Sequence, residues 1–141
     1  MKMNDEITLP CDVRQWLPHR PPMTMVTRLV SYGEWSVVEA EIAPDNRFLR
    51  DGVLDGSVIP ELVAQGCAAI RAYEDRETDL KGMLAGVRNL SVLAAIRSGD
   101  TLTIHVREIV RIDNCSNLEF KLFRSGDELC ATGELSICKL P

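Results

Sequence analysis

The chain has 141 residues, of which 45% are apolar and 26% are charged, and its formal net charge is −5. This composition is typical of a globular chain with a single core, so we expect one domain spanning residues 1–141. The acidic balance leaves no basic surface of the kind that neutralises nucleic-acid phosphates. It therefore argues against binding to DNA or RNA.

Targeting signals and cysteine spacing indicate a cytoplasmic protein. Residues 1–6 are followed by no apolar run, so no signal peptide is visible, and no stretch approaches the roughly 20 apolar residues that span a bilayer. The five cysteines are odd in number and show no Cys-x-x-Cys spacing, which argues against a disulfide framework and against a zinc site. We therefore expect reduced thiols that mostly fill the core, with no metal and no cofactor.

The first expected element is a short helix over residues 9–16. Pro10 suits the first turn of such a helix, and Asp12 suits its positive end. Three prolines then hold residues 17–22 in an extended strip. Alternating apolar side chains predict two strands, over residues 23–30 and 35–42. The polar stretch that follows, residues 44–56, is predicted to be a loop.

Residues 57–76 are predicted to form the main helix. Ser57 is a good helix N-cap, and Pro60 falls in the first turn, where its missing N–H does no harm. Residues 58–70 carry a single charge, that of Glu61. Since a helix that is apolar on every side must be surrounded by protein, we expect this helix to be central.

The rest of the chain predicts long strands separated by hairpin turns at regular spacing. These strands are expected over residues 83–92, 101–111, 118–124 and 129–139. One buried helix followed by several antiparallel strands is an α+β layout. An antiparallel β-sheet wrapped around the long central α-helix, as in the hotdog fold, would bury the helix as its composition demands.

Three motifs occur in order at residues 17–23 (Leu-Pro-His-Arg-Pro-Pro-Met), 55–65 and 97–102. They resemble the Leu-Pro-His-Arg-x-Pro opening, the Pro-Gly-(four residues)-Glu-x-x-Ala-Gln helix start and the Pro-Gly-Asp-x-Leu turn of FabZ-type 3-hydroxyacyl-[acyl-carrier-protein] dehydratases. The resemblance implies a hotdog fold. It also implies that the substrate is a thioester carried by acyl carrier protein (ACP) or by coenzyme A.

The sequence departs from that family in one loop. The family's catalytic histidine lies in a Gly-His-Phe-Pro-Gly loop, fourteen residues before the glutamate of the helix start. In this chain the same distance before Glu61 leads to residues 47–50 (Arg-Phe-Leu-Arg), and residues 46–56 contain no histidine. The family's Val-Asp-Arg is also replaced, by Val-Thr-Arg at residues 26–28. This pattern is more similar to the divergent ApeP-like branch of hotdog proteins. That branch is associated with aryl polyene-type fatty acid synthesis and resembles both dehydratases and thioesterases.

Glu61 and His19 are the candidate catalytic residues. The helix dipole favours the charged form of an early carboxylate and burial favours the neutral form, so Glu61 can be held ready for acid–base work. The alternative is a glutamate that only stabilises the helix end. The resemblance implies that His19 lines the site, either as a replacement base or as a structural hydrogen-bonding group. His105 shares its strand face with Thr103 and Arg107, which is the expected solvent face, so it is not a candidate.

Gly56, Ser57 and Gln65 are the candidate substrate-binding residues. The helix N-terminal amides of Gly56 and Ser57 either hold a thioester carbonyl oxygen or form an ordinary junction. Gln65 lies one turn beyond Glu61 and either orients that carboxylate or packs as a satisfied glutamine. Four apolar residues are candidates for an acyl tunnel and equally for the core: Met23, Met25, Leu62 and Val63.

Three functions are consistent with these residues. The first is a 3-hydroxyacyl-ACP dehydratase-like protein in fatty acid or aryl polyene-type synthesis, in which Glu61 protonates the departing hydroxyl and a base such as His19 removes the α-proton. The second is an acyl-thioesterase, which needs a carboxylate and a polarised carbonyl but no histidine. The third is a non-catalytic or half-site subunit of a heteromeric dehydratase.

The expected partners follow from the sheet and from the substrate. An open sheet edge predicts association, and hotdog relatives pair their sheets edge to edge. The resemblance thus implies a homodimer or higher multiple, or a heterodimer with a histidine-bearing dehydratase subunit. An acidic carrier protein would need a local basic patch, for which the candidates are Arg14, Arg20, Arg47 and Arg50.

Overall fold

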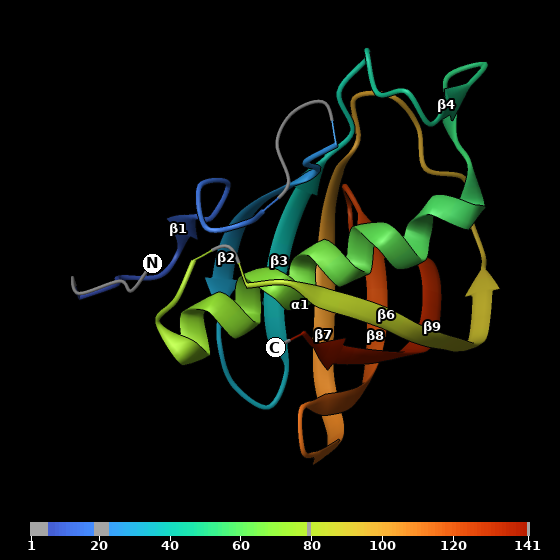
Figure 1. The fold of residues 1–141 in the computed structure, drawn as a ribbon. Coiled ribbons are helices and arrows are strands. Elements are labelled where there is room, and N and C mark those ends of the chain that lie inside the picture. Colours follow the sequence, from blue (N-terminus) through green and yellow to red (C-terminus); the bar gives the residue numbers. More distant parts are fainter. Residues whose placement is uncertain (1–5, 19–22, 79, 141) are drawn as a thin grey trace.

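The computed structural model describes residues 6–18, 23–78 and 80–140. A seven-stranded antiparallel sheet, in the order β1-β2-β3-β7-β8-β9-β6, curves around helix α1 (Figure 1). The elements are β1 (Cys11–Asp12), β2 (Val26–Ser31), β3 (Ser36–Glu41), β4 (Leu49–Arg50), β5 (Val53–Leu54), the 3-10 turn η1 (Gly56–Val58), α1 (Ile59–Asp75), β6 (Gly82–Val92), β7 (Thr101–Ile112), β8 (Cys115–Arg124) and β9 (Glu128–Lys139). The expected α+β layout with a sheet around a central helix is confirmed. No helix in the described ranges is long and apolar enough to cross a membrane.

Helix α1 is buried on most of its surface, as its composition predicts. Leu62 and Ala69 have no exposed surface, and each large aliphatic side chain buried in this way contributes about 1.5–3 kcal/mol. One stripe of the helix is only half-buried, and its members are three or four residues apart, so they share one face. This stripe consists of Glu61, Ala64, Ala68 and Arg71.

The start of α1 differs from the sequence prediction. Ser57 is not the N-cap, because it lies within η1 and its own N–H and hydroxyl both donate to Asp55 Oδ1, at 3.0 and 2.9 Å. Asp55 is therefore the capping side chain of this junction. Pro60 occupies the first turn of α1 as expected.

The expected helix over residues 9–16 is wrong. Cys11 instead pairs with Leu29 as part of β1. The Asp12 carboxylate then accepts the backbone N–H of Arg14 at 2.8 Å, which forms a local turn. Aspartate side chains compete with helical hydrogen bonds in this way, so Asp12 ends the strand rather than starting a helix.

The expected loop over residues 44–56 contains a short hairpin of β4 and β5. Its turn is formed by Asp51 and Gly52, with φ angles of 52° and 76°. Two successive positive φ angles match the twist of antiparallel strands, and the Asp-Gly pair is the sequence signal for such a turn. The hairpin ends directly before Asp55.

The cysteines are not all free thiols. Cys115 and Cys138 lie opposite each other on β8 and β9 and form a disulfide, so the expectation of reduced thiols is wrong for this pair. The two residues are 23 positions apart in the sequence, and only the sheet register brings them together. Cys67 and Cys130 are buried free thiols, and Cys11 is a half-buried one.

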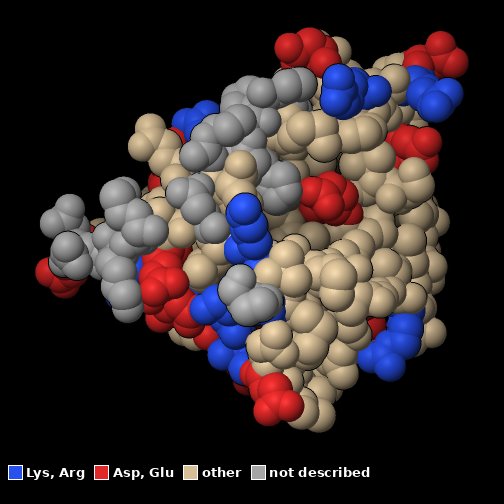
Figure 2. Space-filling view, in the orientation of Figure 1, with Lys and Arg blue, Asp and Glu red and all other residues tan. Residues whose placement is uncertain are grey.

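Strand β6 forms an exposed edge of the sheet. It pairs with β9 on one side only and crosses in front of α1 in Figure 1. Figure 2 shows that the surface over β6 is largely free of charged side chains. Its large apolar side chains are 37–52% exposed, and they are Met83, Leu84, Val87, Leu90 and Val92.

Gly133 of β9 provides a test of the packing beneath β6. A Cβ atom at this position would lie 2.9 Å from Phe120 Cε1 and 3.3 Å from Leu90 Cα. Gly133→Ala should therefore lower the free energy of unfolding by about 1–3 kcal/mol through overpacking. Chemical denaturation measures this change. The control Gly66→Ala on α1, where the nearest atom is 3.7 Å away, should be neutral or stabilising by up to about 1 kcal/mol. Equal stabilities of the two variants would contradict this packing.

Candidate functional site

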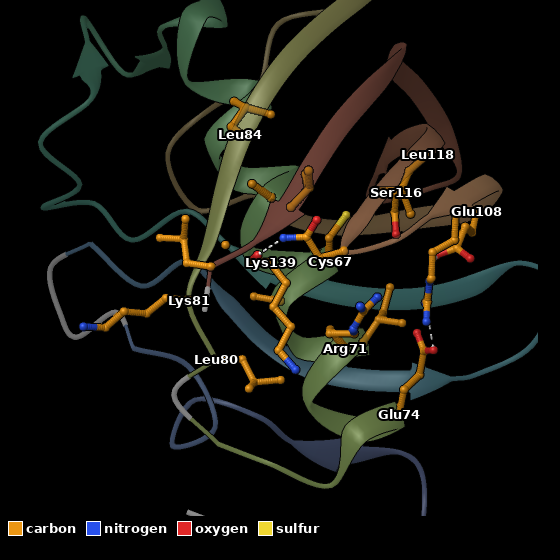
Figure 3. A pocket seen from close by; sticks show the side chains of 18 of the residues that line it. Cys67, Arg71, Glu74, Leu80, Lys81, Leu84, Glu108, Ser116, Leu118 and Lys139 are labelled. Atoms are coloured by element: carbon orange, nitrogen blue, oxygen red, sulfur yellow. Dashed lines mark hydrogen bonds and ion pairs between the residues drawn. The ribbon is translucent and has the colours of Figure 1, made fainter.

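A pocket of about 380 Å³ runs along the half-buried stripe of α1 (Figure 3). Its walls come from α1, from the starts of β6 and β8, and from the ends of β7 and β9. Apolar lining residues include Ala64, Ala68, Leu84, Leu118 and Ile137. Pockets of this size with apolar walls and a few polar groups are the usual form of a small-molecule site.

Glu61 is the acidic residue in the first turn of α1, and it lines this pocket. It belongs to the half-buried stripe, so its carboxylate is placed at the pocket rather than in the sealed core. The positive end of the helix dipole lies close to it. The site therefore combines a carboxylate with an apolar channel that leads away along the helix.

Pro18 lines the pocket together with Glu61. Leu17 before it has no exposed surface, so the start of the proline-rich strip is anchored in the core. His19, the other catalytic candidate, lies outside the described residues. In the sequence it directly follows Pro18, a residue of the pocket wall.

Gln65 is held away from the pocket by hydrogen bonds to the backbone. Its Oε1 accepts the N–H groups of Met25 and Val26 at 2.8 and 3.4 Å, and its Nε2 donates to the carbonyl of Met23 at 2.7 Å. The side chain is completely buried and is not among the pocket-lining residues. Of the two alternatives for Gln65, these contacts favour a packed side chain with satisfied hydrogen bonds over a side chain that orients the Glu61 carboxylate.

Gly56 and Ser57 are not brought into the pocket that Glu61 lines. Gly56 lines a second, more open pocket of about 370 Å³, between the end of β6 and the start of α1. The N–H of Ser57 already donates to Asp55, which lowers the pKa of that carboxyl. The Ser57 amide, which was expected to bind a thioester carbonyl oxygen, therefore already has a hydrogen-bond acceptor within the chain.

Three of the four expected acyl-lining residues belong to the core instead. Met25, Leu62 and Val63 are at most 2% exposed and pack in the main apolar cluster. Met23 is half-buried and does not line the pocket. The alternative assignment to the core is therefore the correct one for the three buried residues.

The small residues of α1 form the pocket wall that the sequence analysis missed. Ala64, Cys67 and Ala68 line the pocket beyond Glu61. The spacing was the available signal, since residues three or four apart on a helix are neighbours: Ala64 follows Glu61 by three, Cys67 follows Ala64 by three, and Ala68 follows Ala64 by four. Burial raises the pKa of the Cys67 thiol to about 12, so this thiol is neutral and acts as a small apolar wall group.

His105 lies on the outer face of the sheet, away from the pocket. Its ring packs at a tilt against that of Phe123, with ring centroids 4.9 Å apart. Burial and the nearby Lys121 ammonium lower the pKa of this imidazole. Its exclusion from the site agrees with this placement.

The expected basic patch is divided among separate partners. Arg14 forms an ion pair with Asp12, and Arg50 Nε lies 3.8 Å from Asp55 Oδ2. Arg47 contacts the sulfur of Met23 at 3.8 Å. Arg20 lies outside the described residues.

The curved sheet, the enclosed helix and the pocket beside Glu61 define a hotdog-fold protein. The chain belongs to the ApeP-like family, because the model of that family, described as ApeP dehydratase, matches residues 11–141. It is thus a FabZ-like member of the hotdog dehydratases.

Individual relatives agree with this family. The chain is 26% identical to a 3-hydroxyacyl-[acyl-carrier-protein] dehydratase FabZ of Clostridioides difficile over 88% of its own length and 92% of that protein. Its fold matches a chain of the dehydratase heterocomplex ApeI:P of Xenorhabdus doucetiae, with a TM-score of 0.80, 23% identity and coverage of 93% and 92% of the two chains. A thioesterase from Haemophilus influenzae also matches, with a TM-score of 0.58, 21% identity and coverage of 80% and 77%.

The structural role of Gln65 can be tested by Gln65→Leu, which keeps a similar volume but removes both polar atoms. The substitution would leave the buried N–H of Met25 and the carbonyl of Met23 without this partner. We expect the free energy of unfolding to fall by about 2–4 kcal/mol. Chemical denaturation measures it. Gln15→Leu at an exposed position is the control, with an expected change within about 0.5 kcal/mol, and similar values for the two variants would refute the assigned role.

Proposed function

We propose that this chain is a component of a dehydratase for 3-hydroxyacyl thioesters carried by ACP or coenzyme A, with Glu61 as an acid–base residue. The observation that carries the proposal is the position of Glu61 at a pocket whose further walls are small and apolar. An apolar channel beside a carboxylate suits an acyl chain whose reacting carbons lie next to the acid. Membership of the ApeP-like family and the FabZ relative support this choice over other thioester reactions.

The proposed reaction is the elimination of water. A base removes the proton from the α-carbon, and the electron pair of that C–H bond forms the double bond between the α- and β-carbons. The C–O bond at the β-carbon breaks, and Glu61 donates a proton so that the hydroxyl leaves as water.

The base is proposed to be His19 or a histidine supplied by a second subunit. Pro18 at the pocket wall directly precedes His19, which supports the first source. The exposed apolar edge at β6 supports the second, because it can pair with another sheet. The related solved structure is titled a dehydratase heterocomplex, which supports a heteromeric partner beside the homodimer.

The working context is also a proposal. The described elements pack on one apolar cluster, which supports a single domain over residues 1–141. A carrier-bound substrate of fatty acid or aryl polyene-type synthesis is consistent with a cytoplasmic protein.

Thioester hydrolysis is the second candidate function. It is favoured by the absence of histidine from residues 46–56 and by the fold match to a thioesterase. In that reaction Glu61 would activate a water molecule that attacks the carbonyl carbon, and the thiol would leave. The two reactions give different products from the same 3-hydroxyacyl thioester.

A turnover experiment separates these functions. The chain is assayed with 3-hydroxydecanoyl-ACP, alone and with a histidine-bearing FabZ-like subunit, and both enoyl product and free thiol are measured. We expect enoyl product, and Glu61→Gln should reduce its rate by about 10²–10⁴-fold because the proton donor is lost. Glu41→Gln at an exposed position of β3 is the matched control and should retain full activity. Thiol release without enoyl product would favour hydrolysis, and a fully active Glu61→Gln variant would refute the site.

Association through β6 gives a separate prediction. Val87 lies at the centre of β6, and Val87→Asp would place a charge at the proposed interface. We expect sedimentation or light scattering to give at least a dimeric mass for the wild type and roughly tenfold to hundredfold weaker association for this variant. Ile109→Asp, on β7 and 51% exposed in the wild type, is the control. A monomeric wild type would contradict the proposed assembly.

A further inference from the structure

Ion-paired side chains line the pocket near the C-terminal end of α1, whereas Glu61 lies in the first turn of the helix. Arg111 Nη2 contacts Glu74 Oε2 at 3.1 Å and Glu108 Oε2 at 2.9 Å, which joins α1 to the end of β7. Beside them, Asp75 Oδ2 lies 3.1 Å from Arg71 Nε and 3.3 Å from Lys139 Nζ. Figure 3 shows Arg71, Glu74 and Glu108 gathered at one side of the pocket, with Leu84 toward another.

These groups are partly buried and mutually compensated. The side chains of Glu74 and Arg111 are 22% and 34% exposed, so an alkyl chain placed against them would displace much of their remaining water. Removing water from an ion pair costs free energy that an alkyl chain cannot return, because it offers no hydrogen bond. This end of the pocket is therefore unfavourable for a long saturated chain.

The apolar part of the pocket has a definite length. Arg71 follows Glu61 by ten residues, and at about 1.5 Å per residue the two positions are about 15 Å apart along α1. Between them the helix presents Ala64, Cys67 and Ala68 to the pocket. These small side chains leave room for a chain that runs along the helix toward the ion pairs.

We propose that the Glu74–Arg111 ion pair determines the maximum length of the acyl group. This inference rests on the proposed function, in which the thioester lies at Glu61. Chains that end within the apolar stretch bind well, whereas longer alkyl chains reach the ion pairs and lose affinity. Glu74 and Arg111 are thus specificity-determining residues that leave the chemistry at Glu61 unchanged.

The same sheet offers a matched ion pair that faces away from the pocket. Arg107, also on β7, forms an ion pair with Glu119 on the outer face and contacts Glu34 at 3.5 Å. Neither Arg107 nor Glu119 lines the pocket. A charge-neutral replacement there changes a similar surface pair without changing the acyl site.

The experiment compares three proteins: wild type, the double variant Glu74→Leu/Arg111→Met, and the control Glu119→Leu/Arg107→Met. Calorimetry measures the binding of non-hydrolysable oxoalkyl thioethers of pantetheine with hexyl, decyl and tetradecyl chains. In the wild type and the control, affinity should rise from hexyl to decyl and then fall at tetradecyl. The pocket variant should bind tetradecyl about tenfold more tightly than wild type, a gain equivalent to burying two further methylene groups. Its affinity for hexyl should be unchanged, which also shows that it is folded.

A second variant tests the same channel in the opposite direction. Ala68→Leu would fill the path between Glu61 and the ion pairs, so decyl binding should weaken about tenfold while hexyl binding changes little. If Ala68→Leu changed the affinities for the hexyl and decyl ligands equally, the proposed path along the helix would be overturned.

The remaining outcomes distinguish this inference from the proposed function. Binding of all chains with the same length dependence in all three proteins would overturn the role of the ion pair and leave the thioester site standing. Tighter tetradecyl binding in both double variants would overturn it as well, since the effect would then not depend on the pocket. No binding of any chain length would overturn the proposed thioester function and this inference together.

Discussion

The packing of α1 inside the curved sheet determines where a ligand can bind. The helix carries so few charges that it is stable only when protein covers it, and the sheet supplies that cover from β2 around to β6. The cover is incomplete along one stripe, where Glu61, Ala64, Ala68 and Arg71 are half-buried. The pocket is the space above this stripe. Its position is therefore a consequence of how seven strands wrap one helix, and its chemistry follows from which residues occupy the uncovered face.

Gln65 links this helix to the segment that carries the second catalytic candidate. The proline-rich strip enters from the buried Leu17 and leaves at Met23, whose carbonyl accepts a hydrogen bond from Gln65. Gln65 lies one helical turn after Glu61, so the backbone on the far side of the strip is fixed relative to the carboxylate. A glutamine is suited to this task because it accepts from two backbone N–H groups and donates to a carbonyl at the same time.

Local patterns in the sequence predicted the helix and the long strands but not the contacts between distant segments. The uncharged run through residues 58–70 was enough to place α1 at the centre, because burial of such a helix depends on composition alone. The pairing of Cys115 with Cys138 depends instead on the register of β8 and β9, which no spacing of cysteines reveals. The motif at residues 55–65 made Glu61 a candidate, and the structure places it at the pocket. The ion pair of Glu74 with Arg111 was not predicted, because it joins residues 37 positions apart.

The sources of the catalytic base are limited by the two histidines of the chain. His105 packs against Phe123 on the outer face of the sheet and cannot reach the pocket without unfolding its strand. A histidine base for the proposed reaction would therefore be His19 or a histidine from another subunit. The exposed strand β6 adjoins the pocket, since Gly82 and Leu84 belong to both. A subunit that pairs with β6 would thus bring its own residues beside the pocket. The proposed heteromeric dehydratase would therefore account for both the exposed sheet edge and the missing loop histidine.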